Sequence, residues 1–364
     1  MSVRILLVGA GWWATAHHLP ALEAHPDAVV AAVCDPVAER AAAVADRTGA
    51  AVHPTLAGAL DAGDYDAALI ATPSAAHHGA AAATLDAGLH TLVEKPLTLT
   101  TADATDLLAR ARRASVHLTV GNTYQHAPAA LLARRAVRED IGRLLQVTVE
   151  FGSRAGQLYA AAERGEAATA RGQHPAAYTA ANGGGQAHTQ LTHALGMLCW
   201  VTGRQVTTVA AFTEHHGLAV DVDDVAALRL EGGATAVAVS TGAVPEPVPL
   251  RQHLRYQGTD GVVEQDLYRA RTVLHRPDGS HVVREPGQHE AAYDAAAPAR
   301  AFVDLVLGRG DNLGGATEAA AAVAATEALL RAARTGAVVG VEPLPAADVP
   351  GACPGTGGPA GEAP

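Results

Sequence analysis

The sequence has few residues of the kind that build covalent or metal-bound frameworks. Its three cysteines, Cys34, Cys199 and Cys353, are odd in number and far apart. They argue against a disulfide framework or a cysteine metal site and favour a reducing compartment. No His-Glu-x-x-His motif occurs, and paired histidines such as His188 and His193 have the wrong spacing to share a metal. We therefore predict no catalytic metal.

Long apolar runs and an excess of positive charge are also lacking. No window approaches the ~18 uninterrupted apolar residues of a transmembrane helix, and no basic-then-apolar signal segment opens the chain. The net charge is −11 with both signs interspersed, which argues against nucleic acid or an anionic membrane as a partner. We predict a cytoplasmic protein whose 364 residues suffice for two domains.

Residues 3–122 alternate short apolar runs with helical patterns, which predicts a parallel sheet covered on both faces. The expected strands are Val3–Val8, Val29–Cys34, Ala67–Ile70, Leu89–Val93 and Val116–Val120, and the expected helices are Ala14–Ala24, Ala38–Arg47, Ala75–Ala87 and Thr101–Ala114. The fold class is α/β, with a doubly wound Rossmann domain over residues 1–123.

The pattern changes after residue 123. Helices are expected at Pro128–Arg138, Gln186–Val201, 296–307 and 316–334, strands at Leu144–Phe151 and in seven segments between Val206 and Val283, and an irregular stretch at 152–182. Turns such as Glu231-Gly232-Gly233 separate the later strands. We predict a second, α+β domain over 124–343 with a large, mainly antiparallel sheet. The Pro/Gly/Ala-rich residues 344–364 are predicted to form a disordered tail.

A glycine-rich loop, Gly9–Ala14, follows the first expected strand. Gly9 permits a tight turn, Gly11 lets a pyrophosphate approach the backbone, and Ala14 allows close helix–strand packing at a helix N-terminus that attracts anions. Asp35 ends the second strand, where a carboxylate accepts hydrogen bonds from a ribose diol and repels a 2′-phosphate. The pattern predicts NAD rather than NADP, although Arg40 leaves contact with a phosphate open.

Trp12 and Trp13 lie inside this loop. They are expected to cover the pyrophosphate, to reach towards a substrate, or to pack where the two domains meet.

Six short motifs occur in one order along the chain, and together they resemble the Gfo/Idh/MocA family, the glucose–fructose oxidoreductase and inositol dehydrogenase group. They are Gly9–Ala14, Asp35-Pro36, Ala71-Thr72-Pro73 with His77, Glu94-Lys95-Pro96, Gly183-Gly184-Gly185, and His193 with Trp200 and Gly203. The resemblance implies a Rossmann domain, a second domain whose open sheet builds homodimers or homotetramers, and a nicotinamide between them. It also implies a sugar or cyclitol substrate and a Pro96 that is often cis.

Oxidation of a secondary alcohol requires a base for the hydroxyl proton and a positive group beside the developing alkoxide. Lys95 suits the second role, and His193 is the candidate base. In the family, the position of Thr189 resembles an aspartate that precedes the histidine by one helical turn. Without that carboxylate the imidazole loses an electrostatic partner. Three consequences stay open: His193 acts alone, Lys95 takes a larger share of proton transfer, or catalysis is reduced.

Further contacts are predicted from position alone. The cofactor set also includes Pro36, Thr72, Pro73, His77, Glu94, Pro96 and Asn122. The predicted substrate contacts are Tyr124, His126, Arg154, His174, Tyr178, Gln186 and His188.

The leading hypothesis is an NAD-dependent dehydrogenase or ketoreductase acting on a pyranoside, amino sugar or cyclitol. The Ala- and Gly-rich composition suggests an actinomycete-like source, where sugar tailoring of antibiotics such as aminoglycosides is common. The alternatives are a lyase or glycosidase that uses NAD for transient oxidation, and a non-catalytic sensor of NAD or sugar.

Overall fold

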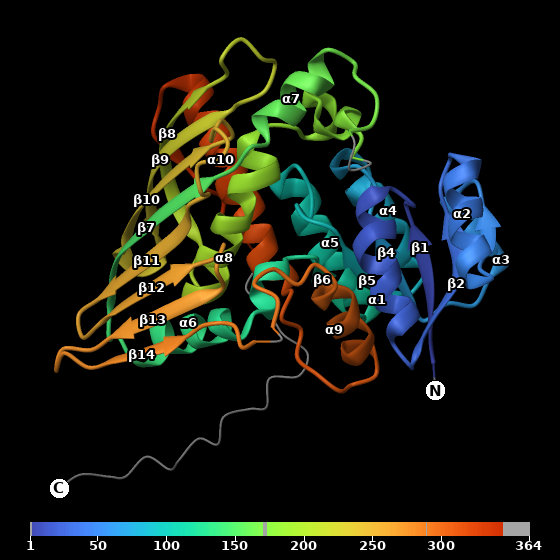
Figure 1. Cartoon of the computed structure of the whole chain (residues 1–364), viewed down its shortest axis with the longest axis horizontal. Coiled ribbons are helices and arrows are strands. Elements are labelled where there is room, and N and C mark those ends of the chain that lie inside the picture. The colour runs from blue at the N-terminus through green and yellow to red at the C-terminus, as the bar shows by residue number, and fades with distance from the viewer. Residues whose placement is uncertain (1, 170–172, 289, 345–364) are drawn as a thin grey trace, which may run out of the picture.

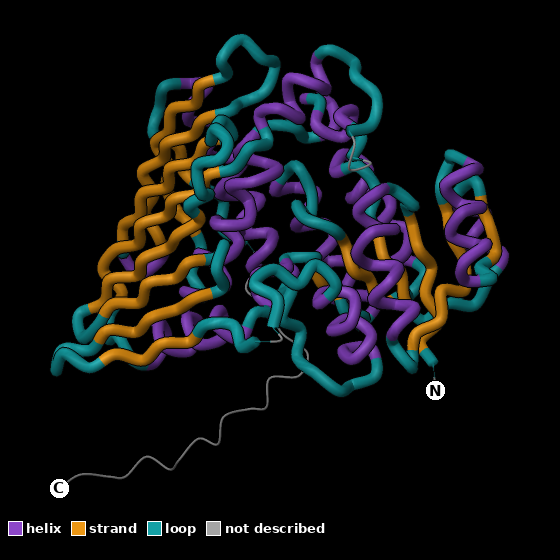
Figure 2. Tube along the Cα trace, in the orientation of Figure 1, coloured by secondary structure: helices purple, strands orange, loops and turns teal. Residues whose placement is uncertain are grey.

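The chain forms two sheets with helices between them (Figures 1 and 2). A computed structural model describes residues 2–169, 173–288 and 290–344. The tail predicted for 344–364 therefore lies outside the described residues, apart from Leu344. Within the described ranges, none of the helices combines the length and hydropathy needed to cross a membrane.

The first sheet is parallel and has the strand order of a doubly wound Rossmann domain, β3-β2-β1-β4-β5-β6. Its strands are β1 (Val3–Val8), β2 (Ala28–Cys34), β3 (Ala51–His53), β4 (Ala67–Ile70), β5 (His90–Val93) and β6 (Leu118–Val120). Its helices are α1 (Leu19–Ala24), α2 (Ala38–Thr48), α3 (Leu56–Ala62), α4 (His77–Asp86) and α5 (Thr101–Ala114). The α/β prediction is confirmed.

The second sheet has nine strands in the order β14-β13-β12-β11-β7-β10-β9-β8-β15, and only the β7–β10 pair is parallel. Its strands are β7 (Leu144–Gly152), β8 (Val206–Glu214), β9 (Asp223–Leu230), β10 (Thr235–Thr241), β11 (Gln252–Gly258), β12 (Val262–Asp266), β13 (Arg271–His275), β14 (His281–Arg284) and β15 (Val339–Gly340). This confirms the predicted large, mainly antiparallel sheet.

Helices cover one face of the large sheet and separate it from the first domain (Figure 1). They are α6 (Pro128–Glu139), α8 (Thr192–Thr202) and α10 (Ala316–Thr335), while α7 (Gly156–Glu163) and α9 (Ala297–Val306) lie elsewhere. Although α9 follows β14 in sequence, its Ala299, Phe302 and Val303 belong to the same hydrophobic cluster as the β1 side chains in the core of the first domain. The chain therefore returns to its first domain after β14 and then adds α10 and β15 to the second.

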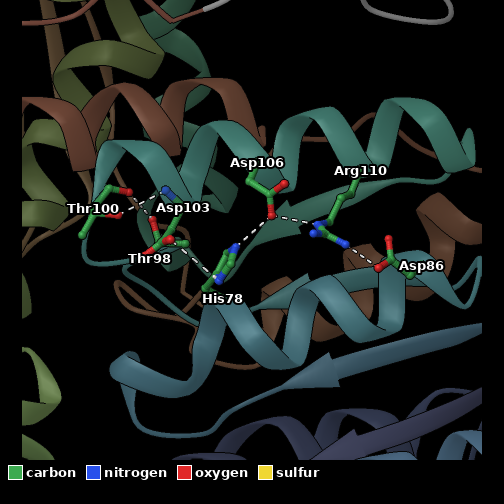
Figure 3. A network of polar contacts seen from close by, with 7 residues as sticks. All are labelled: His78, Asp86, Thr98, Thr100, Asp103, Asp106 and Arg110. Atoms are coloured by element: carbon green, nitrogen blue, oxygen red, sulfur yellow. Dashed lines mark hydrogen bonds and ion pairs between the residues drawn. The ribbon is translucent and has the colours of Figure 1, made fainter.

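An ion-pair network joins α4 to α5 beside the loop that follows β5 (Figure 3). Asp106 accepts from His78 at 2.9 Å and from Arg110 at 2.7 Å, and Arg110 also binds Asp86. The hydroxyl of Thr100 accepts from the backbone of Asp103 and caps α5. Such exposed pairs add little free energy, so the network mainly aligns the two helices.

Several elements were not predicted. The short β3 and α3 lack the long apolar pattern that marked the other elements, and α7 lies inside the stretch 152–182 that was expected to be irregular. Two expected helices begin with π-helical turns, Ala14–His18 and Ala187–Leu191. Residue periodicity does not distinguish such a turn from an ordinary α-helix.

Candidate active site

The glycine loop leaves open space where a dinucleotide is expected. Gly9 has φ +93°, and a Cβ there would lie 2.8 Å from the backbone carbonyl of Ala71, so the fold itself requires this glycine. Gly11 has no heavy atom within 4 Å of the position of a Cβ. Because packing does not explain Gly11, the empty space beside it fits the close approach of a pyrophosphate.

Asp35 lies at the end of β2 and accepts hydrogen bonds from two backbone amides, Ala10 and Val37, each at 2.8 Å. Each carboxylate oxygen keeps a second lone pair for a ribose hydroxyl. The hydroxyl oxygen of Thr72 is buried and has no hydrogen-bond partner. An unpaired polar atom at the carboxyl end of a parallel sheet is a further feature that fits a bound dinucleotide.

Arg40 and His174, predicted separately as a cofactor contact and a substrate contact, hydrogen-bond to one another at 3.1 Å. This contact joins α2 of the first domain to a segment that follows α7. Pro36 is exposed next to Asp35.

Glu94 is buried at the end of β5 and is held by the first domain. Its Oε1 accepts from the indole of Trp13 at 2.8 Å and contacts His18 Nε2 at 2.6 Å. Burial alone would raise the pKa of Glu94, but His18, Lys95 and Trp13 together hold it below its ordinary value. The indole N–H of Trp13 is therefore occupied within the protein, while Trp12 packs edge-on against Trp13 with ring centres 5.7 Å apart.

Lys95 follows Glu94 directly, and its Nζ donates to the backbone carbonyl of Thr189 at 2.8 Å. Burial lowers the pKa of the ammonium group, and the charge of Glu94 partly opposes this shift. The Lys95–Pro96 peptide bond is cis, as the resemblance implies. The ring nitrogens of His77 contact the carbonyl oxygens of Pro96 and Thr72 at 2.7 and 2.9 Å, so His77 links the loops that follow β5 and β4.

The hydroxyl of Thr189 does not face the imidazole of His193. It donates to the Gly185 carbonyl at 2.7 Å and pairs with the hydroxyl of Tyr159 at 2.6 Å. The π-helical turn Ala187–Leu191 contains Thr189, and His193 follows in the first turn of α8.

His193 is buried between aromatic rings, edge-on to Tyr124 and stacked with Phe151. Its Nδ1 has no hydrogen-bond partner. Burial, with a smaller contribution from the charge of Lys95, holds the pKa of His193 well below its ordinary value. The imidazole is therefore neutral near pH 7, and it lacks the carboxylate partner that the family pattern would supply.

These groups meet at a cavity of about 610 Å³ between the two domains. The predicted site residues that line it are Trp12, Trp13, Thr72, Pro73, His77, Glu94, Lys95, Pro96, Tyr124, Tyr178, Thr189 and His193. A volume of this size suits a small ligand together with part of a cofactor.

Gln186 is one predicted substrate contact that the structure contradicts. Its side chain is fully buried, accepting from Ser153 and Tyr159 and donating to Ser240, so it supports the sheet behind the cavity. The other predicted substrate contacts outside the cavity lining are His126, Arg154, His174 and His188. The predicted cofactor contacts outside it are Gly9, Gly11, Ala14, Asp35, Pro36, Arg40 and Asn122. Arg154 contacts the Val248 carbonyl and Glu246 instead.

The cavity also contains residues that were not predicted. Gln252 accepts the hydroxyl of Tyr124 at 2.7 Å, and Tyr268 and Tyr293 form part of the wall. All three lie in the strand-rich segment or after it, where no motif marks them. The sequence distinguishes these residues only by type: they are tyrosines or an amide in a chain with 4% aromatic residues. Within the part of the chain that the structure describes, no group of three metal-ligating side chains occurs.

A doubly wound domain with a dinucleotide loop faces a sheet domain across a cavity that holds a lysine and a histidine. This arrangement defines the class of two-domain NAD-binding proteins. The chain belongs to the Gfo/Idh/MocA oxidoreductase family. Residues 3–122 match the family's NAD-binding Rossmann fold, and residues 131–264 match its C-terminal domain.

Solved structures and curated relatives agree with this assignment. The WlbA dehydrogenase of Bordetella pertussis, solved with NADH and UDP-GlcNAcA, is 25% identical with a TM-score of 0.74, covering 94% of this chain and 99% of that one. GenD2 from gentamicin A biosynthesis, solved with NAD, is 25% identical with a TM-score of 0.72, covering 94% and 97%.

A dTDP-3,4-didehydro-2,6-dideoxy-alpha-D-glucose 3-reductase of Streptomyces antibioticus is 39% identical over 124 residues, which cover 34% of this chain and 38% of that protein. Three curated relatives that match at 34–39% identity align over only 38–42% of their own length.

Proposed function

We propose that this protein interconverts a secondary alcohol and a ketone on a sugar, amino sugar or cyclitol, with NAD as the redox partner. The observation that carries the proposal is Lys95, the only lysine in a chain with 26 lysine and arginine residues. It lies on the same cavity as His193. Every other lysine-or-arginine position in the chain is an arginine. We infer that position 95 requires the properties of lysine, a compact positive charge with an adjustable pKa.

The residues that would hold NAD are the loop Gly9–Ala14, Asp35 and Thr72. The nicotinamide, when bound, supplies the hydride acceptor or donor. Asp35 favours NAD over NADP because its carboxylate would repel a 2′-phosphate. The guanidinium of Arg40, the predicted candidate for a phosphate contact, contacts His174 at 3.1 Å.

Lys95 and His193 would divide the acid–base work. The ammonium of Lys95 polarises the substrate oxygen and stabilises negative charge as it develops there. His193 exchanges the hydroxyl proton at Nε2, because Nδ1 is enclosed in the protein. With a pKa well below its ordinary value, His193 is a weak base on its own. The neighbouring ammonium compensates by lowering the pKa of the bound hydroxyl.

The test is NADH formation by the purified protein with a panel of sugars and cyclitols, followed by absorbance. Lys95→Ala is expected to lower kcat by at least a hundredfold while NAD binding, measured by calorimetry, stays within threefold. Lys95→Arg is the matched control, since it keeps the charge but not the compact donor. Undiminished turnover in Lys95→Ala would contradict the mechanism.

The same panel separates the alternatives. A lyase or glycosidase that uses NAD transiently would consume substrate without net NADH, and a sensor would bind NAD and ligand without consuming either.

We also propose that the protein assembles as a homodimer or homotetramer through the uncovered face of the large sheet (Figure 1). Phe212, Val225 and Val239 are paired neighbours across β8, β9 and β10, and all three are exposed. A row of apolar side chains across three strands is typical of a protein–protein contact.

A further inference from the structure

We infer that the cavity takes an electrically neutral polyhydroxylated ring, rather than a sugar linked to a nucleoside diphosphate or a polycationic aminoglycoside. The inference rests on the proposed function and narrows its substrate class. It departs from relatives whose names specify nucleotide-linked sugars, such as the UDP-N-acetylglucosamine 3-dehydrogenase of Acidithiobacillus ferrooxidans.

The cavity wall offers almost no positive charge. Among the described residues that line it, Lys95 is the only cation, and its ammonium already contacts Thr189 and is placed for the reacting oxygen. Proteins bind diphosphates mainly with arginine forks or helix N-termini. The first-domain helix N-terminus is assigned to the cofactor, and Arg154 is engaged outside the wall. A buried diphosphate would lack partners and would bind poorly.

Negative charge is equally scarce. Glu94 is the only carboxylate among the described lining residues. Its Oε1 contacts Trp13 and His18, and its Oε2 accepts from the backbone of Lys95 at 3.1 Å. The ammonium groups of an aminoglycoside would therefore find no free carboxylate, and they would be repelled by Lys95.

Neutral groups dominate the wall instead. Four of the seven tyrosines and two of the three tryptophans in the chain line this cavity. Tyr268 and Tyr293 remain 49% and 38% exposed, which leaves large rings open to a ligand. Aromatic faces pack against the C–H face of a sugar or cyclitol ring. The amide of Gln190 and the remaining lone pairs on the Tyr124 and Gln252 oxygens, which already share one hydrogen bond, are available to neutral hydroxyls.

The test compares ligands that share a sugar or cyclitol ring but differ in net charge. The NAD-loaded full-length protein is titrated with N-acetylglucosamine, glucosamine and UDP-N-acetylglucosamine, and in parallel with myo-inositol and myo-inositol 1-phosphate. Binding is read by saturation-transfer NMR, and turnover by NADH absorbance. The neutral member of each set is expected to bind at least tenfold more tightly than its charged counterparts.

Tighter binding or faster turnover of either charged class would overturn the inference. If the turnover of a charged ligand is lost in Lys95→Ala, the proposed dehydrogenase function still holds and only the inference of a neutral substrate is wrong. Neutral rings that bind without any net NADH support the inference while contradicting the proposed function. If no member of either set binds, both fail.

A second variant tests the aromatic wall without touching Lys95 or His193. Tyr268→Ala is expected to raise KM for the best neutral substrate at least fivefold with kcat nearly unchanged, while Tyr268→Phe keeps the ring and stays close to wild type. An unchanged KM in Tyr268→Ala would remove the stacking argument.

Discussion

Because Lys95 is the only lysine, its protonation can be observed without interference from other side chains. We expect the pKa of Lys95 to lie below its ordinary value because burial outweighs the charge of Glu94. Glu94→Gln removes the opposing negative charge, so the pKa should fall further. The measurement is the 13Cε shift of ¹³C-lysine-labelled protein against pH.

Asp106→Asn, in the α4–α5 network of Figure 3, is a suitable control because Asp106 lies outside the cavity lining. A Lys95 pKa at or above that of a model peptide, or one that rises in Glu94→Gln, would contradict this account of the site.

Thr189 gives the second prediction at this scale. Its hydroxyl is a donor to the Gly185 carbonyl, and a carboxylate in its place would face that carbonyl without a proton to offer. Thr189→Asp should therefore cost about 1–3 kcal/mol in the free energy of unfolding and lower kcat/KM, even though it restores the family's residue. Thr189→Ser keeps the donor and should stay near wild type.

Urea unfolding and steady-state kinetics measure these effects. Higher activity in Thr189→Asp would show instead that the carboxylate can turn towards His193.

The positions of individual residues were predictable where a motif fixed them. Lys95, Thr189 and His193 were predicted from sequence spacing, and they meet at one cavity. The partners that set their properties were not predictable, since Tyr159 and His18 lie 30 and 76 residues from the groups they bind. Gln186 was misplaced for a related reason: polarity next to a motif does not show which way a side chain points.

At the scale of elements, the two glycines of the loop are expected to have different roles: Gly9 is required for folding and Gly11 for NAD binding. Gly9→Ala combines φ +93° with a Cβ contact at 2.8 Å, so it should destabilise the protein by roughly 2–4 kcal/mol. Gly11→Ala meets no protein atom within 4 Å and should change stability by less than about 0.5 kcal/mol.

Calorimetry with NAD distinguishes the two glycines, because only Gly11 is expected to matter for binding in a well-folded variant. The affinity of Gly11→Ala should fall at least tenfold. Unchanged NAD affinity in that variant would mean that the pyrophosphate does not approach this backbone.

Element type was predictable wherever the apolar pattern was long, and it failed where geometry depends on distant contacts. Two residues outside the π-helical turn Ala187–Leu191 form hydrogen bonds to it: Tyr159 bonds to the hydroxyl of Thr189, and Asp221 accepts from the backbone of Ala187. Neither Tyr159 nor Asp221 belongs to that segment. A pattern with a period near 3.6 residues therefore predicts a helix there but not its register.

At the scale of the whole molecule, the large sheet has one face packed on helices and one face free (Figure 1). The free face carries the row Phe212, Val225 and Val239, of which Phe212 is 78% exposed. Covering this row would remove apolar surface from water without rearranging the fold. We therefore expect light scattering after size exclusion to give a dimer or tetramer at micromolar concentration.

Phe212→Arg should shift this assembly towards the monomer, because it buries an unpaired charge in the contact. Val29→Arg is the matched control, since Val29 is 42% exposed near the start of β2 in the first domain, away from this face. NAD binding should persist in both variants, as the row lies on the opposite side of the sheet from the helices and the cavity. A monomeric wild-type protein, or a Phe212→Arg variant that assembles normally, would show that this face is not where the copies meet.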